Sequence, residues 1–332
     1  MYEINDKNIQ QNSIEQYAPV VAFAYNRADK IIGCLKSLER NPEACRTQLY
    51  IYCDGAKNEK GISKVQETRD ALHRYKDKAA FADITIIEAS KNKGLARSII
   101  EGVTEVINKH HRAIIVEDDL IVSERFLEFM NGALDHYKDN NKIGAISAYT
   151  YPIDALKAYD KGVYTMHKGD CWGWATWADR WNSAAWADVD YDDYFKDKAL
   201  RRRFENTENG WDLLMLLQSQ GKISSWAVRW VLNLLKEDLL TVYPAISYVT
   251  NAGFDGSGTH SNKSEQDHYF TALTTKEGSI VYKDPEPDRL LEKQAAAFPR
   301  KGLKGSLKYY LKRCYVLLYD IRRKLMDDHN DR

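Results

Sequence analysis

The chain has 332 residues, 44% of them hydrophobic and 29% charged, and its formal net charge at pH 7 is zero. This balance is typical of a soluble globular protein with one large domain or two small ones, and it gives no sign of a nucleic-acid partner. No apolar run approaches the roughly 18 residues of a membrane-spanning helix. The first 16 residues are polar and lack the apolar core of a signal peptide, so we expect a cytoplasmic protein.

The first 150 residues alternate between apolar runs and amphipathic segments. The apolar runs predict five strands, at 19–25, 48–55, 83–90, 112–119 and 142–149. Between them, apolar residues recur at helical spacing, and one of the predicted helices begins at a Ser cap, Ser123. This alternation predicts a mostly parallel sheet with helices on both faces.

Polar residues follow three of the predicted strands. They are Asn26-Arg27, Asp54-Gly55 and the acidic triplet Glu117-Asp118-Asp119. In open parallel sheets, ligands bind at the carboxyl ends of the strands, so we expect these side chains to share one edge. There is no GxGxxG motif after the first strand and no GxxxxGK[ST] motif, which argues against a dinucleotide fold or a P-loop.

The acidic triplet has the chemistry of a metal site. Mg²⁺ and Mn²⁺ prefer oxygen ligands, usually one or two carboxylates together with substrate phosphates. Successive side chains of an extended segment point to opposite sides, so Asp119 can bind the metal while its neighbours orient the site. The alternative is a solvated turn or a cluster of charges at a helix start.

After residue 150 the pattern changes. Five of the eight tryptophans lie within 171–186, a helical stretch is split at Gly221, and a short strand is followed by a Gly-rich loop at 251–261. The spacing of Trp177 and Trp181 predicts core residues. Trp172 and Trp174 flank Gly173 and are candidates for the wall of a binding site, because indole rings offer large apolar faces.

Taken in chain order, these motifs resemble those of GT-A-fold glycosyltransferases, in particular the inverting N-acetylglucosaminyltransferase I type. The resemblance covers about residues 19–261. It is carried by the segments VVAFAYNR, IYCDGAKNE, VEDDLIVSERFLEF, GDCWGWATWADRW, NGWDLLM and YPAISYVTNAGFDGSGTHS. Where the family has a His after an Ala-Arg pair, the segment GLARS has Ser98, which leaves the contact to the nucleotide base open.

The resemblance implies a role for each matching residue. Asp119 becomes the direct ligand of Mn²⁺ or Mg²⁺, and Asp212 becomes the general base; Asp212 could instead be a first-turn helix residue stabilised by the dipole. The implied nucleotide-sugar contacts are Arg27, Asp54, Arg97, Glu117, Asp118, Trp211, Gly256 and Gly258. Trp172 and Trp174 would form the wall that binds the acceptor, because indole faces pack well on sugars. Three of the nucleotide-sugar contacts have alternatives, since Asp54-Gly55 could be a plain turn and the two glycines part of a plain surface loop.

The implied function is metal-dependent, inverting transfer of a sugar, with UDP favoured as the nucleotide, to a glycan or lipid-linked acceptor of surface polysaccharide synthesis. A sugar nucleotidyltransferase would place a Gly-rich, Lys/Arg-bearing loop after the first strand, and YNRADKI lacks it. A non-catalytic glycan-binding scaffold is the other alternative. The expected parts are a flexible N-terminus (1–17), a nucleotide-sugar-binding half (18–150), an acceptor-binding and catalytic half (151–262) and a C-terminal extension (263–332).

The C-terminal extension carries the excess of basic residues. Residues 300–332 hold ten Lys or Arg and four Asp, whereas the remainder of the chain is acidic. Apolar residues recur there at three- and four-residue steps, which predicts a basic amphipathic helix on an anionic membrane, at the inner face of the plasma membrane. The alternative is a terminal helix packed on the catalytic domain.

Overall fold

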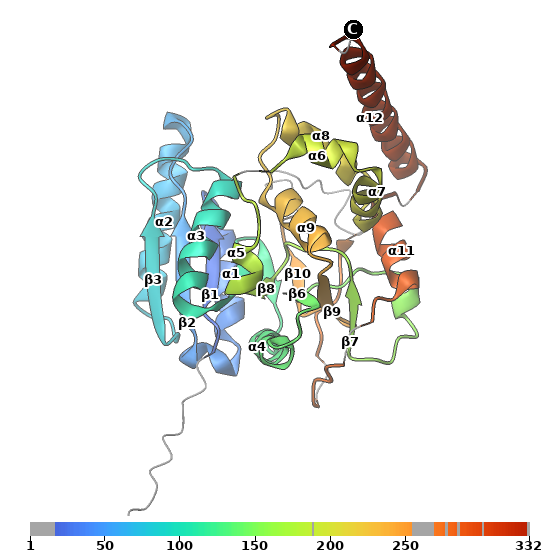
Figure 1. Ribbon diagram of the computed structural model, residues 1–332. Coiled ribbons are helices and arrows are strands. Elements are labelled where there is room, and N and C mark those ends of the chain that lie inside the picture. The colour runs from blue at the N-terminus through green and yellow to red at the C-terminus, as the bar shows by residue number, and fades with distance from the viewer. Residues whose placement is uncertain are drawn as a thin grey trace, which may run out of the picture.

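The first four predicted strands form one side of an eight-stranded sheet in the order β3-β2-β1-β4-β8-β6-β9-β7, and the fifth, β6, lies beyond β8 (Figure 1). The computed structural model describes residues 17–187, 189–253, 269–275, 278–283, 286–300 and 302–330. The expected donor-loop glycines, Gly256 and Gly258, lie outside these ranges.

The five strands predicted from the first 150 residues correspond to β1, β2, β3, β4 and β6, and their bounds agree with the prediction within two residues. The strands of the large sheet are β1 (Val20–Ala24), β2 (Gln48–Cys53), β3 (Asp83–Glu88), β4 (Arg112–Glu117), β6 (Ile143–Ser147), β7 (Val163–Met166), β8 (Trp174–Trp177) and β9 (Leu240–Pro244). Two further strands, β5 (Leu120–Val122) and β10 (Val249–Asn251), form a separate antiparallel pair. The sequence pattern did not predict β5, β7, β8 or β10.

Six strands of the large sheet run in one direction, and β7 and β8 run against them. The fold is therefore a mixed α/β architecture with a mostly parallel sheet, as predicted. Because β8 separates β4 from β6, the two halves of the sheet meet through an antiparallel strand.

Helices cover both faces of the sheet (Figure 1). They are α1 (Ala28–Glu39), α2 (Ile62–Lys76), α3 (Leu95–His110), α4 (Phe126–Tyr137), α5 (Ala178–Asn182), α6 (Tyr191–Lys196), α7 (Lys198–Thr207), α8 (Trp211–Ser219), α9 (Trp226–Lys236), α11 (Arg289–Ala297) and α12 (Gly302–Asn330). The helix expected to begin at Ser123 begins three residues later, because Leu120–Val122 pairs with β10 and holds the chain extended.

Alternate residues of β1 divide between two cores. Val20 and Ala22 pack with α1, α2 and α4, whereas Val21 and Phe23 pack with α3, α5 and α9. This alternation is the consequence of strand geometry in a sheet covered on both faces.

A third core lies among α6, α7, α8, α9 and α12.

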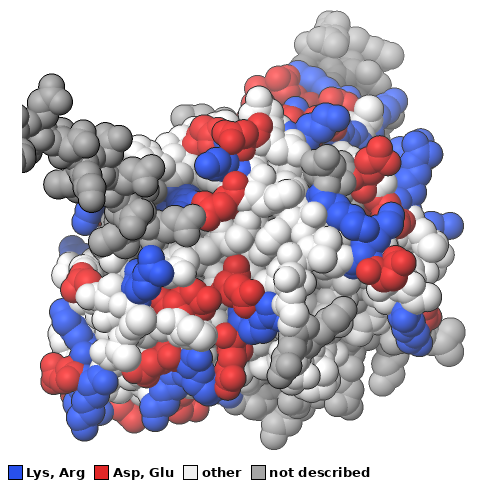
Figure 2. Space-filling model, turned by 90° about the horizontal axis from the view of Figure 1, so that it is seen from below, with Lys and Arg blue, Asp and Glu red and all other residues white. Residues whose placement is uncertain are grey.

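The outer surface seen in Figure 2 has acidic and basic side chains intermixed around a mostly uncharged middle band. No helix in the described part of the chain is long and apolar enough to cross a bilayer.

Candidate functional site

The acidic triplet lies at the carboxyl end of β4, next to the end of β1. The two strands are parallel neighbours, so Arg27, which follows β1, faces the triplet. Its guanidinium donates through Nε to Asp118 (3.1 Å) and through one Nη atom to both Asp118 and Asp119, the latter at 3.0 Å. Sequence reasoning predicted that these residues would converge at one edge, and the structure brings them together.

One guanidinium does not neutralise the cluster. Burial and the charges of Asp119 and Asp118 raise the pKa of Glu117 to about 8. Burial also raises the pKa of Asp118 to about 6, although Arg27 opposes it. Arg27 alone does not balance the negative charge of the acidic triplet, and this arrangement fits a site that binds an additional cation.

Asp119 is held from a second direction by the strand that follows β9. Its backbone carbonyl accepts from Ala252 N (2.7 Å), and its Oδ1 lies 3.4 Å from the side-chain amide of Asn251. Gly253 approaches so closely that an added Cβ would lie 2.4 Å from Asp119 Oδ2. The end of β10 therefore fixes the orientation of this carboxylate.

The donor set fits a divalent metal that shares its ligands with a substrate. Within the described ranges, no group of three or more His, Cys, Asp or Glu side chains is arranged to hold a metal ion. Mg²⁺ and Mn²⁺ need no such cage, since one carboxylate together with phosphate oxygens and water completes their shell. Asp119 is the carboxylate placed to do this.

Asp54, which follows β2, is almost fully buried and organises the loop before α3. Its carboxylate accepts hydrogen bonds from the backbone amides of Gly55, Lys93 and Gly94 and from the side chain of Asn92, all at 2.8–2.9 Å. An alanine Cβ at Gly55 would lie 2.5 Å from the backbone carbon of Lys91. Only glycine allows this close approach of the two loops.

Arg97 lies on the first turn of α3 and is exposed. Its guanidinium pairs with Glu101 one turn later at 2.5 Å. It does not contact the acidic triplet in this arrangement, so its expected role as a diphosphate ligand depends on a movement of the side chain.

An aromatic pocket of about 240 Å³ lies between the start of β8 and the start of α8. Its lining residues are Tyr149, Tyr151, Gly169, Asp170, Cys171, Trp172, Glu208, Trp211, Trp226, Ala227, Trp230, Val231 and Tyr269. Antiparallel pairing of β4 with β8 places Ile115 opposite Trp174. The residues that precede β8 and line the pocket therefore lie toward the carboxyl end of β4, which carries the acidic triplet.

The charges that act on Cys171 also indicate that the pocket and the acidic triplet are neighbours. Burial raises the pKa of the Cys171 thiol well above its usual value, and the charges of Glu117, Asp170, Glu208 and Asp119 raise it further. Cys171 thus lies among carboxylates of both the triplet and the pocket.

The pocket separates the two tryptophans that were expected to form an acceptor wall. Trp172 is partly buried, lines the pocket and contacts Tyr149 edge to face. Trp174 is 1% exposed and stacks on Trp226 and Trp181. The assignment of Trp174 to the acceptor wall is wrong, because its side chain belongs to the core beneath the pocket; Trp177 and Trp181 are core residues, as predicted.

Asp212 does not face the pocket, although Trp211 before it does. Its side chain is 5% exposed, and the carboxylate accepts from Tyr194 (2.9 Å) and twice from Arg201 (3.2 and 2.8 Å). Arg201 also binds Asp320 of α12 at 3.0 and 3.1 Å. This buried network contradicts the expected role of Asp212 as general base, since its oxygens are occupied and enclosed.

Two pocket carboxylates, Asp170 and Glu208, were missed by sequence reasoning. Asp170 accepts from the backbone amides of Cys171 and Trp172 and from Tyr151. Glu208 pairs with Lys168, whose ammonium also reaches the carbonyl of Thr207 at 3.4 Å. The only sequence signal for Glu208 was its position three residues before Trp211.

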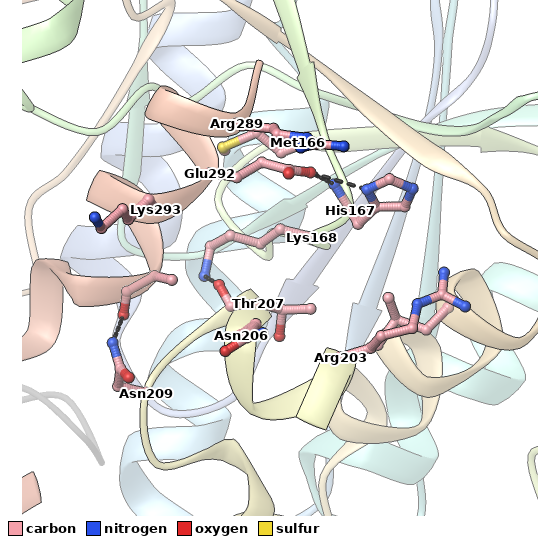
Figure 3. A pocket seen from close by; sticks show the side chains of 12 residues that line it. Met166, His167, Lys168, Arg203, Asn206, Thr207, Asn209, Arg289, Glu292 and Lys293 are labelled. Carbon is pink, nitrogen blue, oxygen red and sulfur yellow. Dashed lines mark hydrogen bonds and ion pairs between the residues drawn. The ribbon is translucent and has the colours of Figure 1, made fainter. Parts of the chain in front are cut away.

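Lys168 lines a second cavity of about 400 Å³ (Figure 3). The side chains of Met166, His167, Arg203, Arg289, Glu292 and Lys293 also line this cavity. In Figure 3 the chain of Lys168 extends toward Thr207 at the end of α7, so its charge is directed at the α7–α8 connection.

Comparison with known protein families identifies the family of this chain. A family model described as the GNT-I family matches residues 3–206, more than half of the chain. No curated protein sequence matches. Among solved structures, a mannosyltransferase from Pyrobaculum calidifontis in complex with GDP-Man and Mn²⁺ aligns with a TM-score of 0.39 and 13% identity, over 67% of this chain and 70% of that one. S. aureus TarS 1–349 gives 0.43 and 9%, over 76% and 62%, and the galactosyltransferase LgtC with donor and acceptor sugar analogs gives 0.36 and 11%, over 65% and 70%.

Proposed function

The chain belongs to the GNT-I family and is a glycosyltransferase, and from that premise we propose that it moves a sugar from a UDP-sugar to a glycan or lipid-linked acceptor with inversion at the anomeric carbon. The observation that carries this proposal is the acidic triplet beside an aromatic pocket: charge for a metal-bound diphosphate on one side, and apolar surface for a sugar on the other.

Each part of the cluster has a separate task in this proposal. Asp119 would hold Mn²⁺ or Mg²⁺, which when bound neutralises charge on the departing diphosphate as a Lewis acid. Arg27 keeps Asp118 and Asp119 oriented. Glu117 and Asp118 would contact the donor sugar and the ribose, and Trp211 and Trp172 would enclose the reacting sugars.

Asp54 would act on the nucleotide indirectly, through the loop that its carboxylate holds together. Arg97 lies at the exposed end of the same loop, and a guanidinium matches phosphate oxygens well. Its pair with Glu101 is exposed and weakened by solvent screening, so a phosphate would readily displace it.

Calorimetry with UDP, with and without Mn²⁺, tests the donor site. Binding only in the presence of the metal supports the proposal, and no binding under either condition supports a non-catalytic scaffold. A nucleotidyltransferase would release pyrophosphate from a nucleoside triphosphate. NMR of the first-formed product determines the configuration at the anomeric carbon, and retention there would refute a single displacement.

We also propose that α12 holds the enzyme against an anionic membrane. Its packed face carries Val316, which is buried, and Asp320 and Arg323, which pair with Arg201 and Asp192. Leu307 and Leu325 lie nine residues before and after Val316, which is two and a half helical turns, so they point away from the body. They are 63% and 64% exposed.

The outward face of α12 is a continuous apolar stripe. Its exposed members are Leu307, Tyr310, Leu311, Leu317, Leu318, Ile321 and Leu325. Lys308, Arg313 and Arg322 lie beside the stripe on the same helix. An amphipathic helix of this layout binds in the headgroup plane of an anionic bilayer, where each basic residue adds about 1 kcal/mol. A lipid-linked acceptor at the inner face of the plasma membrane would then be within reach.

Liposome flotation of the full chain tests this placement. We expect binding to phosphatidylglycerol vesicles that weakens at high salt and is lost in the double variant Leu311→Glu, Leu318→Glu. The matched control is Ile62→Glu, an equally exposed apolar residue on α2, which should still float. Concentration-dependent dimerisation that the double variant abolishes, without flotation of the wild type, would assign the stripe to a second copy and refute the membrane placement.

A further inference from the structure

The acceptor side of the site needs a base, and the aromatic pocket offers two carboxylates. An acceptor hydroxyl that attacks an anomeric carbon must lose its proton, and one positioned carboxylate is sufficient. Among the described residues that line the pocket, only Asp170 and Glu208 carry a carboxylate.

The carboxylate of Asp170 stabilises the local turn by accepting hydrogen bonds from the backbone of the next two residues. Its Oδ1 accepts from the backbone amides of Cys171 (2.8 Å) and Trp172 (3.1 Å), and its Oδ2 accepts from the hydroxyl of Tyr151 (3.2 Å). These bonds orient Trp172 toward the pocket. Both oxygens have donors, so Asp170 is a positioning residue.

Glu208 differs from Asp170 in its partners and its backbone. It lies between α7 and α8 on an extended residue (φ −160°, ψ 130°), outside both helices. Its carboxylate pairs with the ammonium of Lys168, whose side chain is 3% exposed, while the carboxylate side chain itself is 25% exposed. The pair with a buried ammonium holds one carboxylate oxygen in place, and Glu208 lines the pocket.

The surroundings of Lys168 fix that pair in place. Its ammonium lies 5.6 Å from the ring centre of Trp211 and 5.1 Å from that of Tyr151, both of which line the pocket. The carbonyl of Thr207 accepts from it as well. Glu208 is thus anchored in the pocket that Trp172 also lines, and Cys171 between these walls lies near both Glu208 and Glu117.

We propose that Glu208 is the general base of the transfer reaction and that Asp212 has a structural role; this assignment rests on the proposed function. The acceptor oxygen forms a bond to the anomeric carbon of the donor. Its proton passes to the Glu208 carboxylate, and the bond from the anomeric carbon to the phosphate oxygen breaks with its electron pair on the nucleoside diphosphate. The proton then leaves Glu208 for solvent, and no other reactant is needed.

UDP release with Mn²⁺ from UDP-N-acetylglucosamine, UDP-glucose and UDP-galactose, with water as acceptor, provides an assay that does not require the natural acceptor. We expect Glu208→Gln to lose about 10²–10⁴-fold in turnover, the usual value of a positioned base, while UDP binding with Mn²⁺ is retained. Glu208→Asp keeps the charge that Lys168 needs but withdraws the oxygens by one methylene, so it should fold normally and lose at least tenfold.

Asp212→Asn and Glu205→Gln distinguish the two assignments. Glu205 is a buried neighbour on α7 that accepts from the backbone amides of Gly210 and Asp212 and does not line the pocket. Both variants should lower the melting temperature and keep turnover within tenfold. Wild-type rates in both Glu208 variants, or a hundredfold loss in Asp212→Asn at an unchanged melting temperature, would overturn the proposal. Failure of the wild-type protein to bind UDP with Mn²⁺ would instead contradict the proposed function.

Discussion

Gly253→Ala tests the metal assignment without touching a carboxylate. The new Cβ would lie 2.4 Å from Asp119 Oδ2 and 2.9 Å from the side-chain oxygen of Asn251. Gly253 is not among the glycines with positive φ, so the effect of alanine is steric. An ordinary contact needs roughly 3.5 Å, and the Asp119 carboxylate must therefore move by about 1 Å.

The magnitude follows from that displacement. Forcing one extra carbon into a packed site costs typically about 1–3 kcal/mol, which corresponds to about a 5- to 150-fold change in affinity. If Asp119 is the metal-binding carboxylate, the loss appears in the Mn²⁺ dependence of UDP binding. Calorimetry at several Mn²⁺ concentrations measures it.

Gly33→Ala is the matched control. It adds the same methyl group in α1, where the nearest atom is Ile121 Cδ1 at an ordinary 3.7 Å. There alanine should leave UDP binding unchanged and stabilise the helix by up to about 1 kcal/mol. If Gly253→Ala binds UDP with the wild-type dependence on Mn²⁺, the displaced carboxylate is not a metal ligand and the assignment of Asp119 is refuted.

Three other predictions can be checked separately. Asp119→Ala should abolish transfer and the Mn²⁺-dependent part of UDP binding, and retained activity would contradict the metal assignment. Trp174→Ala should lower the free energy of unfolding by about 3–5 kcal/mol, as measured in urea, whereas the pocket residue Trp172 tolerates alanine with a much smaller loss; equal losses would disprove this division. Burial raises the pKa of Asp170 from 3.8 to about 6, so the folded protein binds more protons than the unfolded chain between these values, and stability falls as pH rises through that window by at most about 3 kcal/mol. Asp170→Asn should remove this contribution and make the slope between pH 4 and pH 6 shallower, because Asp118 and Glu117, whose pKa values are also raised, still contribute.

The sheet edge was predictable because the information is local. Continuous apolar runs identify β1, β2 and β4, and parallel strands end on the same side, so Arg27 was expected near Asp118 and Asp119 before any coordinates. The acidic triplet needed no knowledge of distant residues. The family of the chain followed from the same local segments.

The pocket was not predictable because its partners are distant in sequence. The sequence context of Trp172 and Trp174 is the same, because both flank Gly173, but Trp174 packs on Trp226, about fifty residues later in the chain. Asp212 has the sequence context of an accessible helix-start carboxylate. It is enclosed because Arg201 joins it to Asp320, a residue of the last helix.

The position of β8 also constrains how the chain can fold during synthesis. While residues after β4 are still being made, one edge of β4 has no neighbour, and β6 cannot take that place because β8 (Trp174–Trp177) lies between them in the finished sheet. An unpaired central strand is a template for pairing with other chains. A fragment that ends at residue 150 should therefore aggregate in the cell, and a nascent chain needs protection until its tryptophan-rich segment has left the ribosome.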